Sequence, residues 1–352
     1  DFKDQETVRL EAQNENRSQQ TWKQSAFFLK QLYYIGRIDS LTKEGSSAKI
    51  LPTQRVSHAI SYNKDRYKYF RNEADVNHAL SIRDSTPILT NDSTEVRNLR
   101  NEFTYSFYLR GKAVTFIKNE VKLDLGLQHD YYTYQQTRYN NGIGAADSIY
   151  KTNFQNITLK AGIGYRLSDR ITIEGDLQQI AQGRNAGDFL YDAKTNFLLS
   201  KSVGRIVLGA YQQNKSPEQM FERVSYQFQQ WEKNFERTKV SNLSFLYENP
   251  KFRLFAKAEY YLLNNYLYYQ ETAISKKIEP VQFGSNINLL KISGGKHFQF
   301  RKLNLESYVV YQKTDFQDIL RTPEIYAYSS LYYATRLFKV LYTNIGFDVR
   351  YN

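Results

Sequence analysis

The feature that most constrains this chain is a strict alternation of apolar and polar residues, which runs through most of it from Leu99 onward. In Val121–Gln128, four apolar residues alternate with Lys, Asp, Gly and Gln. The same pattern recurs in Ile157–Arg166, Ile171–Gln178 and Leu341–Tyr351. A period of two residues is that of a β-strand with one apolar and one polar face. We count about fourteen such segments, and no helix-period segment of comparable strength interrupts them.

The length of these segments favours one architecture. They run for about ten residues or more, whereas strands in soluble proteins are typically about five to six residues long. A tilted strand that crosses an outer membrane needs about 9 to 11 residues. From the third strand onward, short turns such as Ser168–Arg170 alternate with long polar stretches such as Asp130–Thr152 and Gln212–Thr238.

Short turns at one rim and long loops at the other are typical of outer-membrane barrels. We therefore expect an all-β fold, a transmembrane antiparallel up-and-down β-barrel with short periplasmic turns and long extracellular loops. About 14 strands are visible, and the total is expected to be about 14 to 18. A soluble β-sandwich or solenoid is the alternative, although no fixed repeat unit is evident.

The composition agrees with a barrel once the two faces are separated. The mean hydropathy is only −0.64, but every second residue of a barrel strand faces a polar lumen. No stretch approaches the ~18 to 20 apolar residues of a transmembrane helix. Pairs of tyrosines near the predicted strand ends suit the two membrane interfaces. These pairs include Tyr33–Tyr34, Tyr131–Tyr132, Tyr260–Tyr261, Tyr268–Tyr269 and Tyr332–Tyr333.

Motifs that would indicate catalysis or metal binding are scarce. The chain has no Cys, which excludes disulfide scaffolds and thiol chemistry. It has no G-x-S-x-G, H-E-x-x-H or P-loop motif, and its four histidines lack metal-ligand spacing. Glu174 and Asp176 share a face, but we interpret them as solvated lumen charges with Lys160 and Arg166 as partners on the preceding strand. We predict no enzymatic activity and no cofactor; an outer-membrane lipase or protease is the weakest alternative.

The charged residues of the polar faces are the candidate pore-lining residues. Basic and acidic members are nearly balanced, which predicts at most a weak anion preference because selectivity follows rings of one sign. The set is Arg100, Lys122, Asp124, Lys160, Arg166, Glu174, Asp176, Lys194, Lys257, Glu259, Lys302, Glu306, Asp348 and Arg350.

The formal net charge of +12 raises the question of partners. No dense basic run or RNP-like motif appears, so we predict no nucleic-acid binding. Basic rims and loops can instead pair with outer-membrane lipid and lipopolysaccharide, whose leaflet is anionic. Other outer-membrane proteins and a second copy of the chain remain open as partners.

Three stretches carry a resemblance to a known family. They are SAFFLKQLYYIGR (Ser25–Arg37), the pair FQQWEKNF (Phe228–Phe235) and AEYYLLNNYLYY (Ala258–Tyr269), and Arg321–Asn352 with its terminal G-x-x-x-R-Y strand. The chain resembles the putative porin family of Bacteroidota outer-membrane β-barrel proteins. The resemblance implies a passive pore in the bacterial outer membrane and no catalytic residues. It also implies further strands before Asp1 and after Asn352, so residues 1–352 are expected to be a single β-barrel domain that lacks N- and C-terminal portions of the full protein.

Two functions follow from this interpretation. The first is an outer-membrane, porin-like channel for passive diffusion of small hydrophilic solutes through a polar, mixed-charge lumen. The alternative is a non-catalytic barrel subunit of a larger outer-membrane complex for secretion, barrel assembly or glycan uptake. The long loops Gln212–Thr238 and Asn264–Gln282 could bind partners in that case. We expect them instead to fold inward and narrow the pore.

Overall fold

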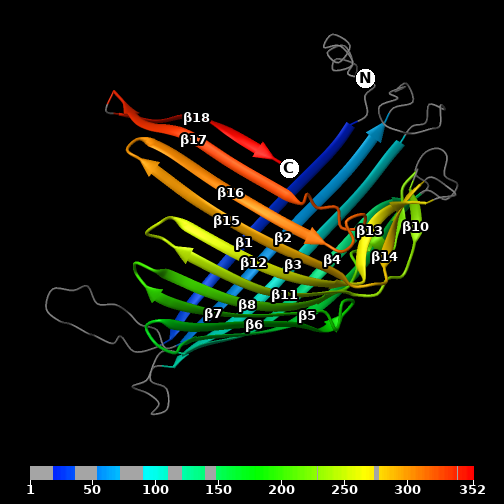
Figure 1. Ribbon diagram of the computed structural model, residues 1–352. Helices are drawn as coiled ribbons and strands as arrows, with labels where there is room; N and C mark the ends of the chain where they lie inside the picture. The colour runs from blue at the N-terminus through cyan, green and yellow to red at the C-terminus, as the bar shows by residue number, and fades with distance from the viewer. Residues whose placement is uncertain are drawn as a thin grey trace, which may run out of the picture.

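The computed structural model describes residues 19–35, 54–71, 90–109, 121–138, 148–227, 229–272, 277–338 and 340–352. Most of them form strands of one 14-stranded antiparallel sheet, in which each strand pairs with its neighbours in chain order (Figure 1). Its strands are β1 (Gln19–Ile35), β2 (Gln54–Arg71), β3 (Thr90–Leu109), β4 (Val121–Arg138), β5 (Ser148–Arg166), β6 (Ile171–Gly183), β7 (Phe189–Ser200), β8 (Gly204–Lys215), β11 (Thr238–Asn249), β12 (Leu254–Asn264), β15 (Ile287–Phe300), β16 (Leu303–Thr314), β17 (Ile325–Leu337) and β18 (Leu341–Tyr351).

Two connections carry structure of their own. The β8–β11 connection contains a four-residue helical turn, α2 (Gln219–Glu222), and a hairpin of β9 (Arg223–Ser225) and β10 (Gln230–Glu232). The β12–β15 connection contains a hairpin of β13 (Tyr266–Glu271) and β14 (Ile278–Phe283). No helix among the described residues is long and apolar enough to cross a membrane.

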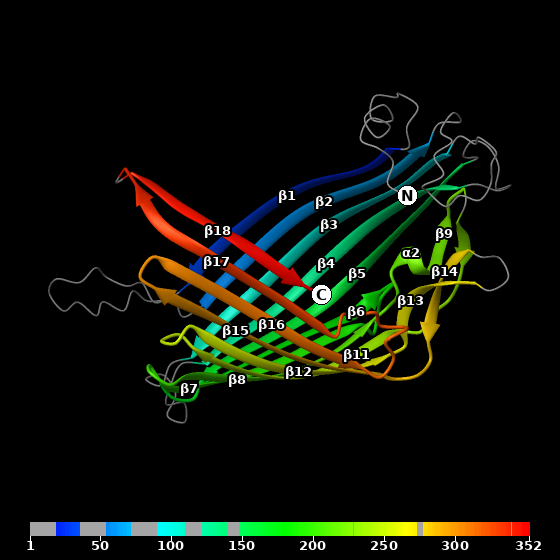
Figure 2. The ribbon, with the colours of Figure 1, turned by 45° about the horizontal axis from the view of Figure 1, so that its top comes forward.

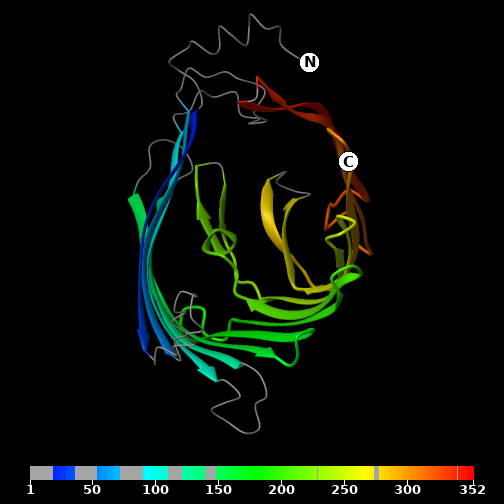
Figure 3. The ribbon, with the colours of Figure 1, turned by 90° about the vertical axis from the view of Figure 1, so that its left-hand side faces the viewer.

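The sheet coils around a central space (Figures 2 and 3). Strands β1–β5 form one side, β15–β18 form the opposite side, and the two hairpins lie inside the outline at the end of the long connections (Figure 3). Strands β1 and β18 stand at the two ends of the strand order, and no pairing between them is found among the described residues. The predicted all-β, antiparallel, up-and-down wall with about 14 visible strands is therefore confirmed, and the total of 14 to 18 stays a prediction.

Burial across the wall is the reverse of that in a soluble protein. On β4, Leu125 and Leu127 are 63% and 47% exposed, whereas Gln128 and Asp130 are only 6% and 3% exposed. The apolar residues of the alternation thus point outward and the polar residues point to the central space. An outward apolar band with a polar interior is the arrangement that lipid imposes on a barrel.

Three further strands are predicted from the sequence on a less regular pattern, in the segments Ala26–Gly36, Gln54–Tyr62 and 324–336. The structure places β1, β2 and β17 there, and β2 runs nine residues further, to Arg71. Its added half carries many charged residues and lacks alternation, but it pairs with both β1 and β3. The alternation of side chains predicts that this strand ends near Tyr62, but hydrogen bonding to a strand on each side continues β2 to Arg71.

The tyrosine pairs were predicted to suit the two membrane interfaces, and the structure shows how their members are oriented. Adjacent strand residues point to opposite faces, so only one member of each wall pair points outward. Tyr260 is 44% exposed on the outer face, whereas Tyr261 donates a hydrogen bond to Glu259 on the inner face. Tyr268–Tyr269 lies in the β13 hairpin rather than in the wall.

The turn before β8 gives a test of the fold. Gly204 has φ +100°, and a Cβ added there would lie 2.1 Å from the backbone oxygen of Glu248 in β11. We expect Gly204→Ala to cost more than the ~1–2 kcal/mol of a left-handed residue, and to lower the temperature at which the folded form is lost on a heat-modifiability gel. Gly284→Ala is the control, because nothing lies within 4 Å of a Cβ there. Equal thermal stability of the two variants would contradict the assigned turn.

Candidate functional site

The register gives the positions of the candidate pore-lining residues. Those on β3–β7, β12, β16 and β18 lie on the face that carries the buried polar residues. They are Arg100, Lys122, Asp124, Lys160, Arg166, Glu174, Asp176, Lys194, Lys257, Glu259, Glu306, Asp348 and Arg350.

Lys302 departs from this set. It lies in the turn between β15 and β16, and its Nζ contacts Thr335 Oγ1 at 3.2 Å and lies 5.7 Å from the ring centroid of Tyr333. Tyr333 and Thr335 are on the outward face of β17, opposite to Tyr332, which donates a hydrogen bond to Glu306. The alternation that placed Lys302 inward therefore fails where the strand has ended.

The inner-face charges are largely paired with one another. Three pairs lie two residues apart on one strand: Lys122–Asp124 and Lys194–Asp192 at 2.5 Å, and Lys257–Glu259 at 2.6 Å. Residues i and i+2 of a strand share a face, which is why these pairs form without help from another strand. The inner wall therefore presents neutral pairs rather than a ring of one sign.

The expected partners of Glu174 and Asp176 are not those in the structure. Lys160 pairs with Glu102 at 3.1 Å, and Arg166 pairs with Asp169 in the following turn at 2.8 Å. The β6–β7 register instead sets Lys194 opposite Glu174. The prediction was wrong because it paired charges with the preceding strand without knowing the register.

Glycines on the inner face make room for these pairs. A Cβ on Gly162 would lie 3.2 Å from Asp176 Oδ1 and 3.4 Å from Asp124 Cβ. One on Gly126 would lie 3.1 Å from Lys160 Cβ. Charged side chains from neighbouring strands thus occupy the space above each glycine.

At the end of the long connections, the segment Ser216–Arg237 folds into the central space. We call it the inward segment; all of it except Phe228 is described. Its backbone crosses to the far wall, where Ser225 N donates to Gln136 Oε1 on β4 and Gln227 N donates to Asp92 Oδ1 on β3, each at 3.1 Å.

Tyr226 adds a side-chain contact to the same wall. Its hydroxyl forms a hydrogen bond with Thr94 Oγ1 on β3. Burial raises the pKa of the Tyr226 phenol, so this hydroxyl stays protonated at neutral pH. The expectation that this loop folds inward therefore agrees with the structure.

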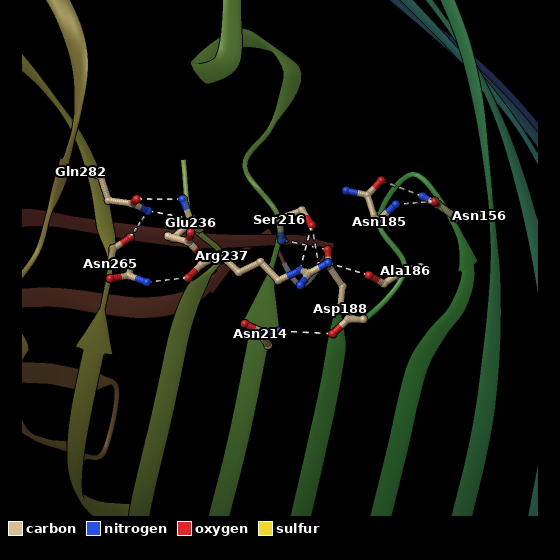
Figure 4. A network of polar contacts seen from close by, with 11 residues as sticks. Asn156, Asn185, Ala186, Asp188, Asn214, Ser216, Glu236, Arg237, Asn265 and Gln282 are labelled. Carbon is tan, nitrogen blue, oxygen red and sulfur yellow. Dashed lines mark hydrogen bonds and ion pairs between the residues drawn. The ribbon is translucent and has the colours of Figure 1, made fainter. Parts of the chain in front are cut away.

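One carboxylate holds both ends of the inward segment (Figure 4). Asp188, in the turn before β7, accepts hydrogen bonds from the backbone N and the hydroxyl of Ser216 at 2.8 and 2.6 Å. It also accepts a charge-assisted bond from Arg237 Nε at 3.0 Å. Arg237 Nη2 donates further to the carbonyl of Ala186 at 2.6 Å. The first and last residues of the segment are thereby fixed beside the same turn.

The inward segment is also joined to the β13–β14 hairpin. Lys233 Nζ lies 2.7 Å from Glu279 Oε2, and Gln282 exchanges two hydrogen bonds with the backbone of Glu236 at 2.9 and 2.7 Å. The rings of Phe221 and Tyr269 stack with centroids 5.2 Å apart. The two loop structures therefore form one connected unit across the end of the central space.

Between this unit and the inner wall of β1–β8 lies a cavity of about 1120 Å³. Its lining combines aromatic rings with amide and charged side chains. Members of each kind are Tyr67, Tyr132, Tyr134, Phe154 and Phe189; Gln128, Asn156, Gln178 and Gln213; and Arg100, Asp130, Arg184, Asp188 and Glu218. The mixture suits a hydrated polar solute better than an apolar one, because every polar group there can exchange hydrogen bonds with water or solute.

No group of three or more His, Asp or Glu residues that could hold a metal is present in the part of the chain that the structure describes. His129 and His297 instead contact the side-chain amides of Gln155 and Asn304, respectively. His78 lies outside the described residues.

Sequence reasoning missed the residues that hold the inward segment. Asp188 and Arg237 are 49 positions apart, and neither lies in a motif or on an alternating face. No local pattern of the sequence identifies such a pair.

A 14-stranded antiparallel wall with an apolar outside, a polar inside and hairpin connections is that of an outer-membrane β-barrel protein. Within that class, a family model described as "Putative porin" matches residues 1–352, the whole chain. The chain belongs to this family, and the family points to the bacterial outer membrane.

Solved structures share the fold at low sequence identity. The copper transporter OprC superposes with a TM-score of 0.64 at 11% identity, covering 89% of this chain and 50% of that one. The siderophore receptor PirA from Acinetobacter baumannii superposes with a TM-score of 0.57 at 10% identity, covering 94% of this chain and 56% of that one. The pyoverdine outer membrane receptor FpvA from Pseudomonas aeruginosa PAO1 superposes with a TM-score of 0.56 at 10% identity, covering 90% of this chain and 49% of that one.

The chain thus spans about half the length of these outer-membrane barrels. No curated protein matches it.

The Asp188 contacts predict how the inward segment responds to mutation. The Asp188 side chain is only 10% exposed, and Asp188→Ala removes three hydrogen bonds at once. Loss of buried charged partners costs on the order of 2–3 kcal/mol, so we expect the segment to detach from the turn. Limited trypsin digestion in detergent should then cut after Arg223 and Lys233 much faster than in the unmodified protein.

Glu218→Gln is the control for that experiment. Glu218 lies in the same segment, but among the described residues its carboxylate pairs with the exposed Lys215 alone, and such exposed pairs contribute about 0–1 kcal/mol. Cleavage that rises equally in both variants would mean that Asp188 does not hold the segment.

Proposed function

We propose that this protein is a channel through which small hydrophilic solutes diffuse passively across the outer membrane. The observation that carries the proposal is the inner wall: its charges lie on one face, and many of them are paired as neutral couples such as Lys122–Asp124 and Lys257–Glu259. A wall of this kind keeps water and polar solutes in the lumen without a strong preference for ions of one sign. A source in Bacteroidota belongs to the same proposal.

The inward segment sets the narrowest part of this path. It reaches from the β8–β11 edge of the wall to β3 and β4, and its contacts to Asp92 and Gln136 hold it across the lumen. A cavity of about 1120 Å³ remains beside it. The segment therefore restricts the size of a solute while leaving a polar passage along β3–β7.

The structural neighbours suggest a different kind of transport. They are a copper transporter and a siderophore receptor, which would correspond to selective uptake here. Passive diffusion is the better match to the described residues, because the segment that lies in their lumen is a connection between two paired strands of the wall.

Conductance measurements test the channel. Purified protein in planar bilayers should give discrete ohmic current steps with little difference between cations and anions. A variant in which a short Gly-Ser linker replaces residues 217–236 should give larger steps, because Lys215 and Thr238 are already paired across adjacent strands. A folded barrel that carries no current in either form would refute the proposal.

The face assignment can be tested without current. Since the chain has no Cys, single Cys variants are unambiguous reporters. Asp176 lies on the inner face and its neighbour Leu177 is 50% exposed on the outer face. In intact membranes, a charged water-soluble thiosulfonate should modify Asp176→Cys at least about tenfold faster than Leu177→Cys, because only lumen positions meet water. Equal rates would show that the two faces are not separated by lipid.

A further inference from the structure

Cations and aromatic rings gather on the outward face at the short-turn end of β12, β15, β16 and β17. We call this group the rim patch. It comprises Lys251 and Phe252 in the β11–β12 turn, Lys296, Phe298 and Phe300 at the end of β15, Arg301 and Lys302 in the β15–β16 turn, and Tyr333 on β17. Because β12 pairs with β15 and β16 pairs with both β15 and β17, these residues are adjacent across the sheet.

Each cation of the rim patch lies over an aromatic ring. Lys251 and Lys296 both flank the ring of Phe252, with Nζ 5.7 and 5.9 Å from its centroid. Lys296 also lies 4.8 Å from the centroid of Phe298, and Arg301 Cζ lies 5.7 Å from that of Phe300. Such contacts hold the cations against the wall at the level of the rings.

The orientation of the patch follows from the register. The ring of Phe255 lies over its partner Gly295 on the inner face. Lys296 and its partner Leu254 are the next residues along the two strands, so they lie on the opposite face. Lys296 therefore points outward, as do Phe298 and Phe300, which are 52% and 73% exposed. The patch borders the apolar band that lipid covers.

The positive charge of the patch is not neutralised by the protein. No acidic residue occupies an outward position on β12, β15, β16 or β17 in the described part of the chain. Among the described residues, none of Lys251, Lys296 and Arg301 has a carboxylate partner, in contrast to the paired lysines of the inner wall.

Other described turns at the same rim lack this outward combination. Arg336, beside the β17–β18 turn, lies 4.8 Å from the ring centroid of Tyr342, but the register places both residues on the inner face. Arg170 in the β5–β6 turn and Lys201 in the β7–β8 turn are exposed cations with no ring contact. The rim patch is thus a local feature of one side of the barrel rather than a general property of its short turns.

We propose that the rim patch binds the phosphate headgroups of anionic phospholipid. The rings sit at the depth where a membrane changes from acyl chains to headgroups, and the cations beside them are placed to contact phosphate oxygens there. We assign the ligand to the phospholipid leaflet rather than to lipopolysaccharide, because short turns of outer-membrane barrels lie on the periplasmic side.

Native mass spectrometry of the full chain in neutral detergent tests this proposal. Phosphatidylglycerol, phosphatidylcholine and lipid A are titrated separately. We expect the unmodified protein to retain phosphatidylglycerol in preference to phosphatidylcholine. The double variant Lys251→Gln/Lys296→Gln should bind phosphatidylglycerol roughly tenfold or more weakly, since each basic residue near an anionic surface contributes about 1 kcal/mol.

Two further variants separate the patch from general charge and from misfolding. Arg170→Gln/Lys201→Gln removes the same charge at the same rim and should bind as the unmodified protein does. Lys251→Arg/Lys296→Arg keeps the charge and should also retain binding. Migration as a folded, heat-modifiable band verifies each variant.

Three results would overturn the proposal: equal losses in the two Gln variants, no preference for phosphatidylglycerol over phosphatidylcholine, or loss of lipid A binding alone in Lys251→Gln/Lys296→Gln. The third would assign the patch to lipopolysaccharide.

Discussion

Backbone pairing within the sheet is the constraint on which the rest of the structure depends. In hydrocarbon, an unpaired N–H or C=O costs several kcal/mol, so a chain can cross a membrane as strands only if each strand is paired along its length. Here each interior strand of the 14-stranded sheet has a partner on both sides. Once pairing is fixed, the pleat separates the residues into an apolar outer face and a polar inner face.

The polar face then meets its own constraint, because charges brought into the lumen have to be stabilised. The protein does this locally. Same-strand pairs such as Lys122–Asp124 and Lys257–Glu259 need no particular register, and Gly126 and Gly162 leave space for the neighbouring side chains. On the outer rim the cations are not paired with carboxylates. Among the described residues, Lys251 and Lys296 contact aromatic rings instead.

The sequence predicted the strands and their faces because a period of two is a local signal, visible within Val121–Gln128 alone. It could not predict contacts that depend on register, such as Lys160 with Glu102 rather than with Glu174. Nor could it predict Asp188 with Arg237, which become neighbours only because the turn before β7 lies beside the ends of β8 and β11. Lys302 shows a further limit, since alternation ceases to assign a face once a strand ends.

The way the inward segment is fastened has a consequence for how such proteins diversify. Its two ends, Ser216 and Arg237, meet at one carboxylate, and the strands that flank it are already neighbours in the wall. The residues between these ends can therefore change in length and chemistry while the strand pairing stays the same. In this arrangement the wall stays constant, and the width of the space that it encloses can change by the replacement of one hairpin rather than by the redesign of a barrel.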